Sequence, residues 1–561
     1  MLRGNKYLDS IGLPLLFGLL CFSTFLLMRR AGVLLSDDFF IHLRIATHWL
    51  STGQPFFNVD ERVLGTSSPL YVGLLVVILA LCGKSWFMGL LILQSIVVAT
   101  LSLLVFSLVK NLSGTNLFAA LAATSAMLLS IESALLGMET PLALALMTFS
   151  LLILKQHPLA ALACSAVCVS VRLECLIFHG LVTGYLFLTS HRKVKCLLVS
   201  ILYVVLVIGG VWIVFGTVIP QPAIAKGVVY QLSWSDSLST WRSVFEVFFD
   251  PPREMPNSQF QRATWLSFFL CLCAFVINRR YLSREIVGVS VMLWSFSALV
   301  IAGYITKGVL VFPWYVPLVL FPLGTAASIV GAAVPLAKNR LLAACLVGLT
   351  AYYPTWSLWG FYREELISNR ELEAGRASRL LEIGLRINRC GTSYAVLASE
   401  IGAVGVGYTG IVRDGVGLVS PEALRYHPLR VGIERSAINE GVIPLKFVRA
   451  ISPDVIVSLP GLIQVGAVDA LREDYALIRE PVFLGDDARV GSYRSIWGAE
   501  EVLILVRDKD LLTCFESNSS VYSDPAQLLR EVAVGVGRAG GLSASPSFRE
   551  TAIRPSQSPI E

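Results

Sequence analysis

Residues 36–50 of the chain read SDDFFIHLRIATHWL, and two adjacent carboxylates, Asp37 and Asp38, stand near its start. The stretch lies just beyond the first long apolar run, which ends at Met28. An ionised side chain at the centre of a membrane helix costs roughly 2.5–3.5 kcal/mol, so acids at a membrane edge indicate a functional site. A solvated loop that happens to carry two acids is the alternative. The residues around the pair decide between the two interpretations.

Apolar side chains recur at helical spacing after the two acids, at Phe40, Ile41, Ile45, Trp49 and Leu50. The pattern predicts an amphipathic helix that lies on the membrane surface. Its first turn would present both aspartates, because a helix N-terminus favours carboxylates. His42 and His48 are six residues apart, so on this helix they do not share a face as metal ligands would.

The composition identifies the class of protein. Of 561 residues, 55% are hydrophobic and only 15% are charged, and the mean hydropathy is +0.69. Soluble domains carry about 25% charged residues, so the chain is predicted to be a polytopic α-helical membrane protein. Its net charge of +6 fits Lys and Arg in cytoplasmic loops, and we expect no nucleic-acid partner.

Apolar runs near the spanning length of about 20 residues recur along the first 360 residues and predict about eleven membrane helices. The predicted spans are residues 11–29, 69–83, 86–109, 117–136, 140–154, 158–189, 196–216, 263–278, 286–305, 312–335 and 341–360.

Basic clusters orient these spans. The clusters at residues 191–195, 279–280 and 338–340 should be cytoplasmic by the positive-inside rule. That orientation puts a first loop, residues 36–68, and a second, larger loop, residues 217–264, on the outer side. Everything after residue 360 would lie there as well.

The composition changes after residue 360. Short apolar runs of strand length alternate with charged helical stretches, which predicts an extracytoplasmic α/β domain over residues 361–523. Residues 524–561 are rich in Gly, Ser, Arg and Pro, and predict a disordered tail. Within the domain, the glycine spacing of residues 402–407 matches no nucleotide-binding motif, so we expect a plain turn.

Only two of the eleven cysteines, Cys390 and Cys514, lie in this polar part. They could pair in an oxidising compartment, but their separation in sequence leaves the question open. The other cysteines that lie in apolar runs, such as Cys164 and Cys168, are expected to be packing residues.

A set of short motifs follows the two aspartates in order over residues 36–320. The segments are Asp37-Asp38-x-Phe40-Ile41-x-x-Arg44, Asn58-x-x-Glu61-Arg62-Val63, Gly65-x-Ser67-x-Pro69-Leu70, Gly137-Met138-Glu139-Thr140-Pro141, Arg172-Leu173-Glu174, Phe215-Gly216 through Pro220 to Lys226, and Trp314-Tyr315-x-Pro317. Together they resemble the bacterial GT-C superfamily of glycosyltransferases, and most closely its arabinofuranosyltransferase-like members, which use polyprenyl-phosphate sugar donors.

The resemblance implies a transferase that moves a sugar, with arabinofuranose favoured, from a polyprenyl-phosphate donor to a glycan, lipid or protein acceptor. It favours Asp37 as the general base, with direct displacement and inversion. Asp38 would orient the acceptor or hold a divalent cation, Mg²⁺ or Mn²⁺. The donor phosphate needs positive charge, for which Lys226 and Arg172 are the candidates.

Other residues of the matched motifs are candidates for substrate binding, namely Arg44, Glu61, Ser67, Glu139, Glu174, Trp314 and Tyr315. The resemblance also implies a bacterial cytoplasmic membrane, with the active site and the C-terminal domain outside.

Structural roles remain open for several of these residues. Glu139 and Glu174 could be interfacial acids, Arg172 with Glu174 a buried structural pair, and Trp314 with Tyr315 interfacial aromatics.

In the C-terminal domain, Glu400, Asp414 and Tyr408 surround glycine-rich turns, and residues 415–421 resemble a stretch of the same transferases. These residues could position the acceptor or only support the fold. Two other functions also fit the composition: a transporter or flippase of lipid-linked sugar, and a non-catalytic glycan-binding membrane subunit.

Overall fold

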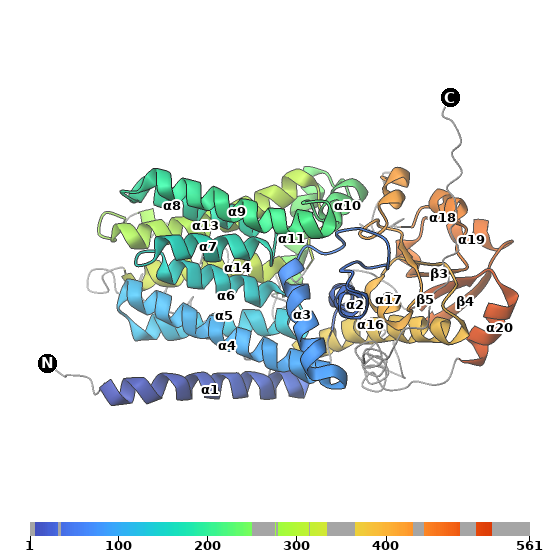
Figure 1. Cartoon of the computed structure of the whole chain (residues 1–561), viewed down its shortest axis with the longest axis horizontal. Coiled ribbons are helices and arrows are strands. Elements are labelled where there is room, and N and C mark those ends of the chain that lie inside the picture. The colour runs from blue at the N-terminus through green and yellow to red at the C-terminus, as the bar shows by residue number, and fades with distance from the viewer. Residues whose placement is uncertain are drawn as a thin grey trace, which may run out of the picture.

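The computed structural model describes residues 6–31, 35–248, 275–276, 279–312, 315–333, 365–429, 443–482 and 501–518. Apolar helices form a bundle that occupies one part of the molecule, and a smaller domain of helices and strands stands at one end of that bundle (Figure 1). This arrangement confirms the predicted fold class of a helical membrane protein with a C-terminal α/β domain.

The bundle contains helices α1 and α3 to α9, followed by α13 and α14. Their bounds are α1 Lys6–Ala31, α3 Pro69–Cys82, α4 Trp86–Ser113, α5 Asn116–Leu135, α6 Thr140–Ile153, α7 Pro158–Val169, α8 Cys175–Thr189, α9 Lys193–Phe215, α13 Arg284–Lys307 and α14 Val316–Ala333. Five stretches within the described residues are long and apolar enough to cross a membrane, and four shorter apolar helices accompany them. The chain is therefore a multi-pass membrane protein. The predicted span 341–360, and nearly all of span 263–278, lie outside the described residues.

One predicted span is wrong. Residues 158–189 form two helices, α7 and α8, which pack against each other across a break at residues 170–174. The break contains Arg172 and Glu174. A continuous helix would carry these charges into the apolar interior, whereas the reversal holds both at an end of the bundle.

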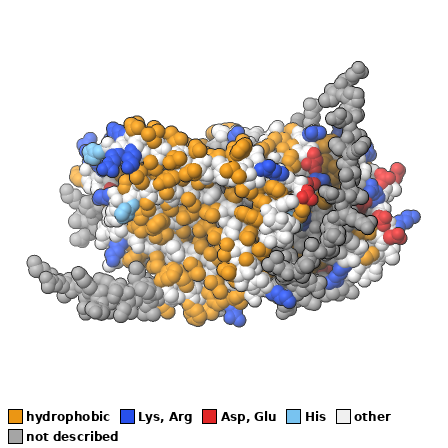
Figure 2. Space-filling view, viewed as in Figure 1, with side chains coloured by type: hydrophobic (Ala, Val, Ile, Leu, Met, Phe, Trp, Pro, Cys, Tyr) orange, Lys and Arg blue, Asp and Glu red, His pale blue; other side chains and the backbone are white. Residues whose placement is uncertain are grey.

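The bundle presents an apolar surface. Figure 2 shows hydrophobic side chains gathered over its helices, while charged side chains lie mostly toward the two ends of the molecule. Helix α9 is exposed along most of its length and buries only Cys196, Ser200 and Phe215. A hydrogen bond of 2.8 Å between Ser200 Oγ and His179 Nε2 links it to α8. Such a surface matches the apolar interior of a bilayer.

The basic clusters at residues 191–195 and 279–280 lie at the end of the bundle that is opposite Glu139 and Glu174. Helix α6 begins beside Glu139 and ends near Lys155, whose ammonium pairs with Glu285 at the start of α13 at 2.8 Å. Residues 279–280 precede α13, and residues 191–195 follow α8, which begins beside Glu174. Both clusters therefore lie at the end of the bundle opposite Glu139 and Glu174.

The C-terminal domain is built on a five-stranded sheet with the order β2-β1-β3-β5-β4. The strands are β1 Val396–Ala398, β2 Val412–Asp414, β3 Val455–Ser458, β4 Ala476–Pro481 and β5 Glu501–Val506. Strands β2, β1 and β3 are parallel, and β5 is antiparallel to both β3 and β4. The residues of β1 and β3 are all buried, as expected for strands covered on both faces.

Helices of different lengths surround the sheet. They are α16 Glu365–Cys390, α17 Gly402–Gly407, α18 Leu445–Ile451, α19 Ala467–Leu471 and α20 Lys509–Ser517, with 3₁₀ turns at Pro421–Tyr426 and Pro460–Leu462. A disulfide between Cys390 and Cys514 joins α16 to α20, so the pairing that the sequence left open is present.

The disulfide closes a long segment, with a sequence separation of 124 residues. Because a cross-link restricts the unfolded chain, its loss typically costs about 2–5 kcal/mol. We expect Cys514→Ser to lower the thermal transition of the detergent-purified protein, measured by scanning fluorimetry. Cys82→Ser, which removes a free thiol of α3, is the matched control and should change little. Equal transitions for both variants would contradict this prediction.

Candidate active site

Helix α2 (Asp37–Thr52) carries the two aspartates, and its position differs from the prediction. It packs against α3 and α17, between the bundle and the C-terminal domain, instead of lying on a membrane surface. Asp37 and every residue from Phe39 to Ala46 are buried. The helix is therefore buried as far as Ala46, because its polar face contacts a domain distant in sequence.

The start of α2 is fixed by the bundle. Ser36 caps the helix, its Oγ accepting the N–H of Phe39 at 3.3 Å, and its own N–H donates to the carbonyl of Leu136 at 3.2 Å. Gly137 follows with a φ of 77°, and a side chain there would collide with the ring of Phe39. The hydroxyl of Tyr71 donates to the carbonyl of Gly137 at 2.6 Å. The start of the Gly-Met-Glu-Thr-Pro motif thus packs against the first turn of α2 and fixes its position.

Asp37 joins α2 to the C-terminal domain. Its carboxylate accepts the backbone N–H of Gly402 at 3.0 Å and of Ala403 at 2.8 Å, the first two residues of α17. Residues 402–407 are therefore a short helix, and the plain turn predicted there is wrong. Gly402 is required because a Cβ would collide with the carbonyl of Asp37.

Arg44 holds the other end of α17. Its guanidinium donates to the carbonyls of Gly405, Tyr408 (2.5 Å) and Gly410 (2.7 Å), and its Nε donates to the carbonyl of Phe57 at 2.7 Å. The side chain is 3% exposed and does not line the pocket described below. These contacts give Arg44 a structural task, and its predicted contact with substrate has no support from its position.

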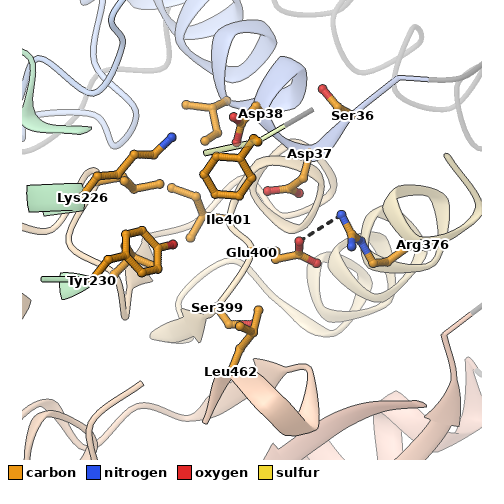
Figure 3. A pocket seen from close by; sticks show the side chains of 14 residues that line it. Ser36, Asp37, Asp38, Lys226, Tyr230, Arg376, Ser399, Glu400, Ile401 and Leu462 are labelled. Atoms are coloured by element: carbon orange, nitrogen blue, oxygen red, sulfur yellow. Dashed lines mark ion pairs between the residues drawn. The ribbon is translucent and has the colours of Figure 1, made fainter. Parts of the chain in front are cut away.

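A pocket opens where α2 meets the C-terminal domain (Figure 3). Its lining residues are Ser36, Asp37, Asp38, Ile41, Lys226, Tyr230, Phe312, Arg376, Ser399, Glu400, Ile401, Val416, Leu418 and Leu462. The space measures about 650 Å³ including its mouth. Of the predicted site residues, the structure brings Asp37, Asp38 and Lys226 together here, with Glu400 from the C-terminal domain.

Asp38 differs from Asp37 in its bonding. Within the described residues its carboxylate makes no hydrogen bond or ion pair, and the side chain is only partly buried. In Figure 3 the two aspartates lie between Lys226 and Tyr230 on one side and the pair formed by Arg376 and Glu400 on the other. Asp38 is therefore a carboxylate with open lone pairs inside the pocket.

Lys226 is the cation of the opposite wall. It lies on α10 (Gln221–Val229), and its ammonium donates to the hydroxyl of Tyr315 at 3.1 Å. It also lies over the ring of Phe312, 4.6 Å from the ring centre. Burial lowers the pKa of Lys226, but Tyr315 and Asp38 outweigh it and raise that pKa above its ordinary value. Lys226 is thus a charged ammonium facing the pocket.

Arg172 lies outside this pocket. Its guanidinium pairs with Glu139 at 3.0 Å and with Glu174 at 2.8 Å, and Glu174 accepts the hydroxyl of Tyr304 at 2.6 Å. The guanidinium carbon is 4.9 Å from the ring centre of Tyr315. The buried structural pair that the sequence left open is therefore present, extended to a triad of one cation and two acids. Phosphate binding by Arg172 would have to displace one of these carboxylates.

The remaining predicted residues lie elsewhere. Glu61 pairs with Arg413 at 2.6 Å, which ties the first loop to β2, and Ser67 precedes α3 without lining the pocket. Tyr315 holds Lys226 without lining the pocket itself, and Trp314 lies outside the described residues.

Asp414 is fully buried and organises a loop, accepting backbone N–H groups from Val416, at 2.8 Å, and from Leu418 and Val419. Tyr408 donates its hydroxyl to the carbonyl of Tyr394 at 2.5 Å. Neither residue lines the pocket, so of the three C-terminal residues singled out in the sequence only Glu400 does.

Among the lining residues that the sequence did not predict are Tyr230, Arg376, Ser399 and Phe312. Ser399 and Glu400 directly follow β1, which is parallel to both of its neighbours. Sites of open α/β sheets lie at the carboxyl ends of parallel strands, so this position was a usable signal. Arg376 lies within a charged helical stretch, where nothing in the sequence distinguishes it from its neighbours.

A metal ion is not supported by the donor set. Among the described residues, no group of three or more His, Cys, Asp or Glu side chains is placed to hold one. Each oxygen of Asp37 already accepts an N–H group and Glu400 pairs with Arg376, so Asp38 is the pocket carboxylate without such a partner among the described residues, and it lies beside an ammonium. These residues do not fit a divalent cation, which prefers several oxygen ligands.

Comparison with known proteins supports the fold. No protein-family model matches the chain, and no curated protein matches it. Among solved structures, ArnT from Cupriavidus metallidurans bound to undecaprenyl phosphate is similar, with a TM-score of 0.51 and 14% identity over 89% of this chain and 99% of that chain. Apo ArnT gives a TM-score of 0.46, with 12% identity over 90% of this chain and 99% of that chain. The chain thus has the GT-C fold that its motifs predicted.

The close contact at Gly402 can be tested directly. We expect Gly402→Ala to separate α17 from α2 and to cost about 1–3 kcal/mol, as overpacking usually does. Thermal unfolding of the purified protein measures this loss. Gly303→Ala is the control, because a Cβ at Gly303 in α13 has open space around it. A Gly402→Ala protein as stable as the control would show that the contact at Asp37 is not needed.

The stability of this contact should depend on pH. Burial raises the pKa of Asp37 from 3.8 to about 6, and that of Asp414 from 3.8 to about 7. Between pH 3.8 and the raised pKa of each group, the folded protein keeps a proton that the unfolded chain has released. Their contribution to stability is complete below pH 3.8 and is lost as the pH rises through 6 and 7. We expect the melting temperature to fall over this range, and less steeply in Asp37→Asn. Equal slopes for the two proteins would contradict the assignment to Asp37.

Proposed function

We propose that the protein is a membrane glycosyltransferase that transfers a sugar from a polyprenyl-phosphate donor to an acceptor hydroxyl. The observation that carries the proposal is the pocket at the edge of the bundle, where the open carboxylate of Asp38 and the ammonium of Lys226 line the same space. The GT-C fold supports it, because ArnT, which shares that fold, binds undecaprenyl phosphate.

Within this proposal Lys226 binds the donor phosphate. Its charge stabilises the oxygen that develops negative charge as the sugar–phosphate bond breaks. The electron pair of that bond stays with the polyprenyl phosphate. Arg172 was the second candidate, but its two carboxylate partners make it a weaker one.

Asp38 is the better candidate for the general base. The resemblance favoured Asp37, whose oxygens both accept N–H groups of α17. Asp38 has open lone pairs, and a base must lie within hydrogen-bond reach of the proton it takes. The acceptor oxygen would lose its proton to Asp38 as it forms the bond to the sugar carbon. Direct displacement with one base inverts that carbon, and Asp37 acts by positioning α2 and its neighbour.

Arabinofuranose remains the donor sugar favoured by the motifs, and the acceptor remains a glycan, lipid or protein. The Mg²⁺ or Mn²⁺ expected from the sequence is not part of the proposal, because the described carboxylates of the pocket do not fit a divalent cation. We further propose that the pocket faces the outside of a bacterial cytoplasmic membrane. Two observations support this orientation: the basic clusters at residues 191–195 and 279–280 lie at the opposite end of the bundle, and disulfides such as Cys390–Cys514 persist in oxidising compartments.

A transporter or flippase would need acids along a path through the bundle, near its midplane. The described acids of the pocket lie instead on α2 and beside β1, where the bundle meets the C-terminal domain. This position favours the transferase. A non-catalytic glycan-binding subunit would share the pocket but would not depend on a base.

Substitution at Asp38 separates these functions. We expect Asp38→Asn to lower the transfer rate by roughly 10²–10⁴, the usual contribution of a general base, with an unchanged melting temperature, because Asp38 has no structural partner among the described residues. The assay follows loss of labelled polyprenyl-phosphate sugars from a donor panel. Asp37→Asn should instead lower the melting temperature, since an amide offers only one acceptor atom to two N–H groups.

Asp469→Asn is the control for the substitution itself, because Asp469 lies on α19, away from the pocket. Full transfer activity in Asp38→Asn would contradict the assignment of the base. Donor binding without turnover by folded wild-type protein, across the whole panel, would favour the transporter or the glycan-binding subunit.

A further inference from the structure

The wall of the pocket opposite Lys226 contains a second pair of charged residues. Arg376 of α16 and Glu400, which follows β1, pair at 3.2 Å. Their side chains are 7% and 9% exposed, and both line the pocket. Figure 3 shows this pair on the far side of the aspartates from Lys226 and Tyr230. The pocket therefore has two polar ends with the carboxylates between them.

The two ends differ in charge. At one end Lys226 is a cation suited to a phosphate. At the other end the charges of Arg376 and Glu400 cancel, and Ser399 adds a hydroxyl. An anionic ligand at this end would be repelled by Glu400, and a cationic one by Arg376. A neutral ligand with adjacent hydroxyls can donate to the carboxylate and accept from the guanidinium without leaving either charge unpaired.

The rest of this wall is apolar. Ile401, Val416, Leu418 and Leu462 line the pocket beside the charged pair. A sugar ring presents apolar C–H groups on its faces and hydroxyls around its edge, so it can contact both kinds of surface. An ionic headgroup would leave these apolar side chains without a matching partner.

We infer that Arg376, Glu400 and Ser399 form an acceptor subsite, contributed by the C-terminal domain, that binds an uncharged sugar through neighbouring hydroxyls. The inference rests on the proposed transfer reaction and specifies its acceptor class. Asp38 lies between the two ends, as a base must if it takes a proton from a sugar held here. Arg376 and Glu400 bind substrate in this arrangement and do not take part in proton transfer.

The test uses the full-length protein in detergent, with the labelled polyprenyl-phosphate donor that it turns over. Acceptor probes are neutral octyl glycosides, compared with the anionic octyl glucuronide and a cationic octyl aminoglycoside. We expect a neutral glycoside to accelerate donor consumption most. Glu400→Gln and Arg376→Lys should raise the KM for that glycoside by about tenfold, as expected for the loss of one hydrogen bond to a charged group. The KM for the donor should change much less than the KM for the glycoside.

Glu480→Gln is the matched control. Glu480 of β4 pairs at 2.7 Å with Arg386, which lies on α16 as Arg376 does, but this pair is outside the pocket. Preference for a charged acceptor, or variants that alter the donor KM instead of the acceptor KM, would overturn the subsite. Donor hydrolysis that no neutral glycoside accelerates would overturn it as well. An absence of any donor turnover would instead contradict the proposed function, and the subsite with it.

Discussion

The structure depends on the contact between α2 and α17. Asp37 accepts the N–H groups at one end of α17, and Arg44 donates to the carbonyls at the other, so a helix of six residues is bound at both termini by one partner. The charges match the helix dipole, with the carboxylate at the N-terminus and the guanidinium near the C-terminus. Because β1 and Glu400 directly precede α17, this contact also sets where the sheet meets the bundle. The pocket is lined by residues of both parts, so its shape depends on this contact.

Two adjacent aspartates acquire different tasks from this contact. Side chains at neighbouring positions of a helix point about 100° apart, so one faces α17 while the next faces the pocket. Each oxygen of Asp37 accepts one N–H group of α17, whereas the carboxylate of Asp38 accepts none among the described residues. The sequence identifies the pair as important but cannot distinguish its members, because the partners of Asp37 lie 365 and 366 residues away. Which carboxylate is open to substrate is a property of the tertiary structure.

The apolar runs were sufficient to predict the membrane bundle and the change to an α/β domain, because burial in lipid or protein imposes strong periodic patterns. Prediction failed where a tertiary contact overrides a local pattern. Residues 158–189 have the hydrophobicity of a single span, yet they reverse where Arg172 and Glu174 pair. Residues 402–407 are rich in glycine, which favours turns, but there the glycines permit close packing against α2 and α16. Arg376 has a sequence context typical of an exposed helix and becomes buried only because α16 borders the pocket.

The two cations differ as the two aspartates do: one is held by structural partners, and the other faces the pocket. Arg172 is neutralised by Glu139 and Glu174, so little of its charge remains available to a phosphate. Its guanidinium instead lies against the ring of Tyr315, whose hydroxyl accepts a hydrogen bond from Lys226. A neutral hydroxyl positions the ammonium and leaves its charge in place. A carboxylate in the same position would neutralise that charge. The buried triad therefore stabilises the support of Lys226, and the one ammonium of the pocket wall among the described residues remains free to attract an anion.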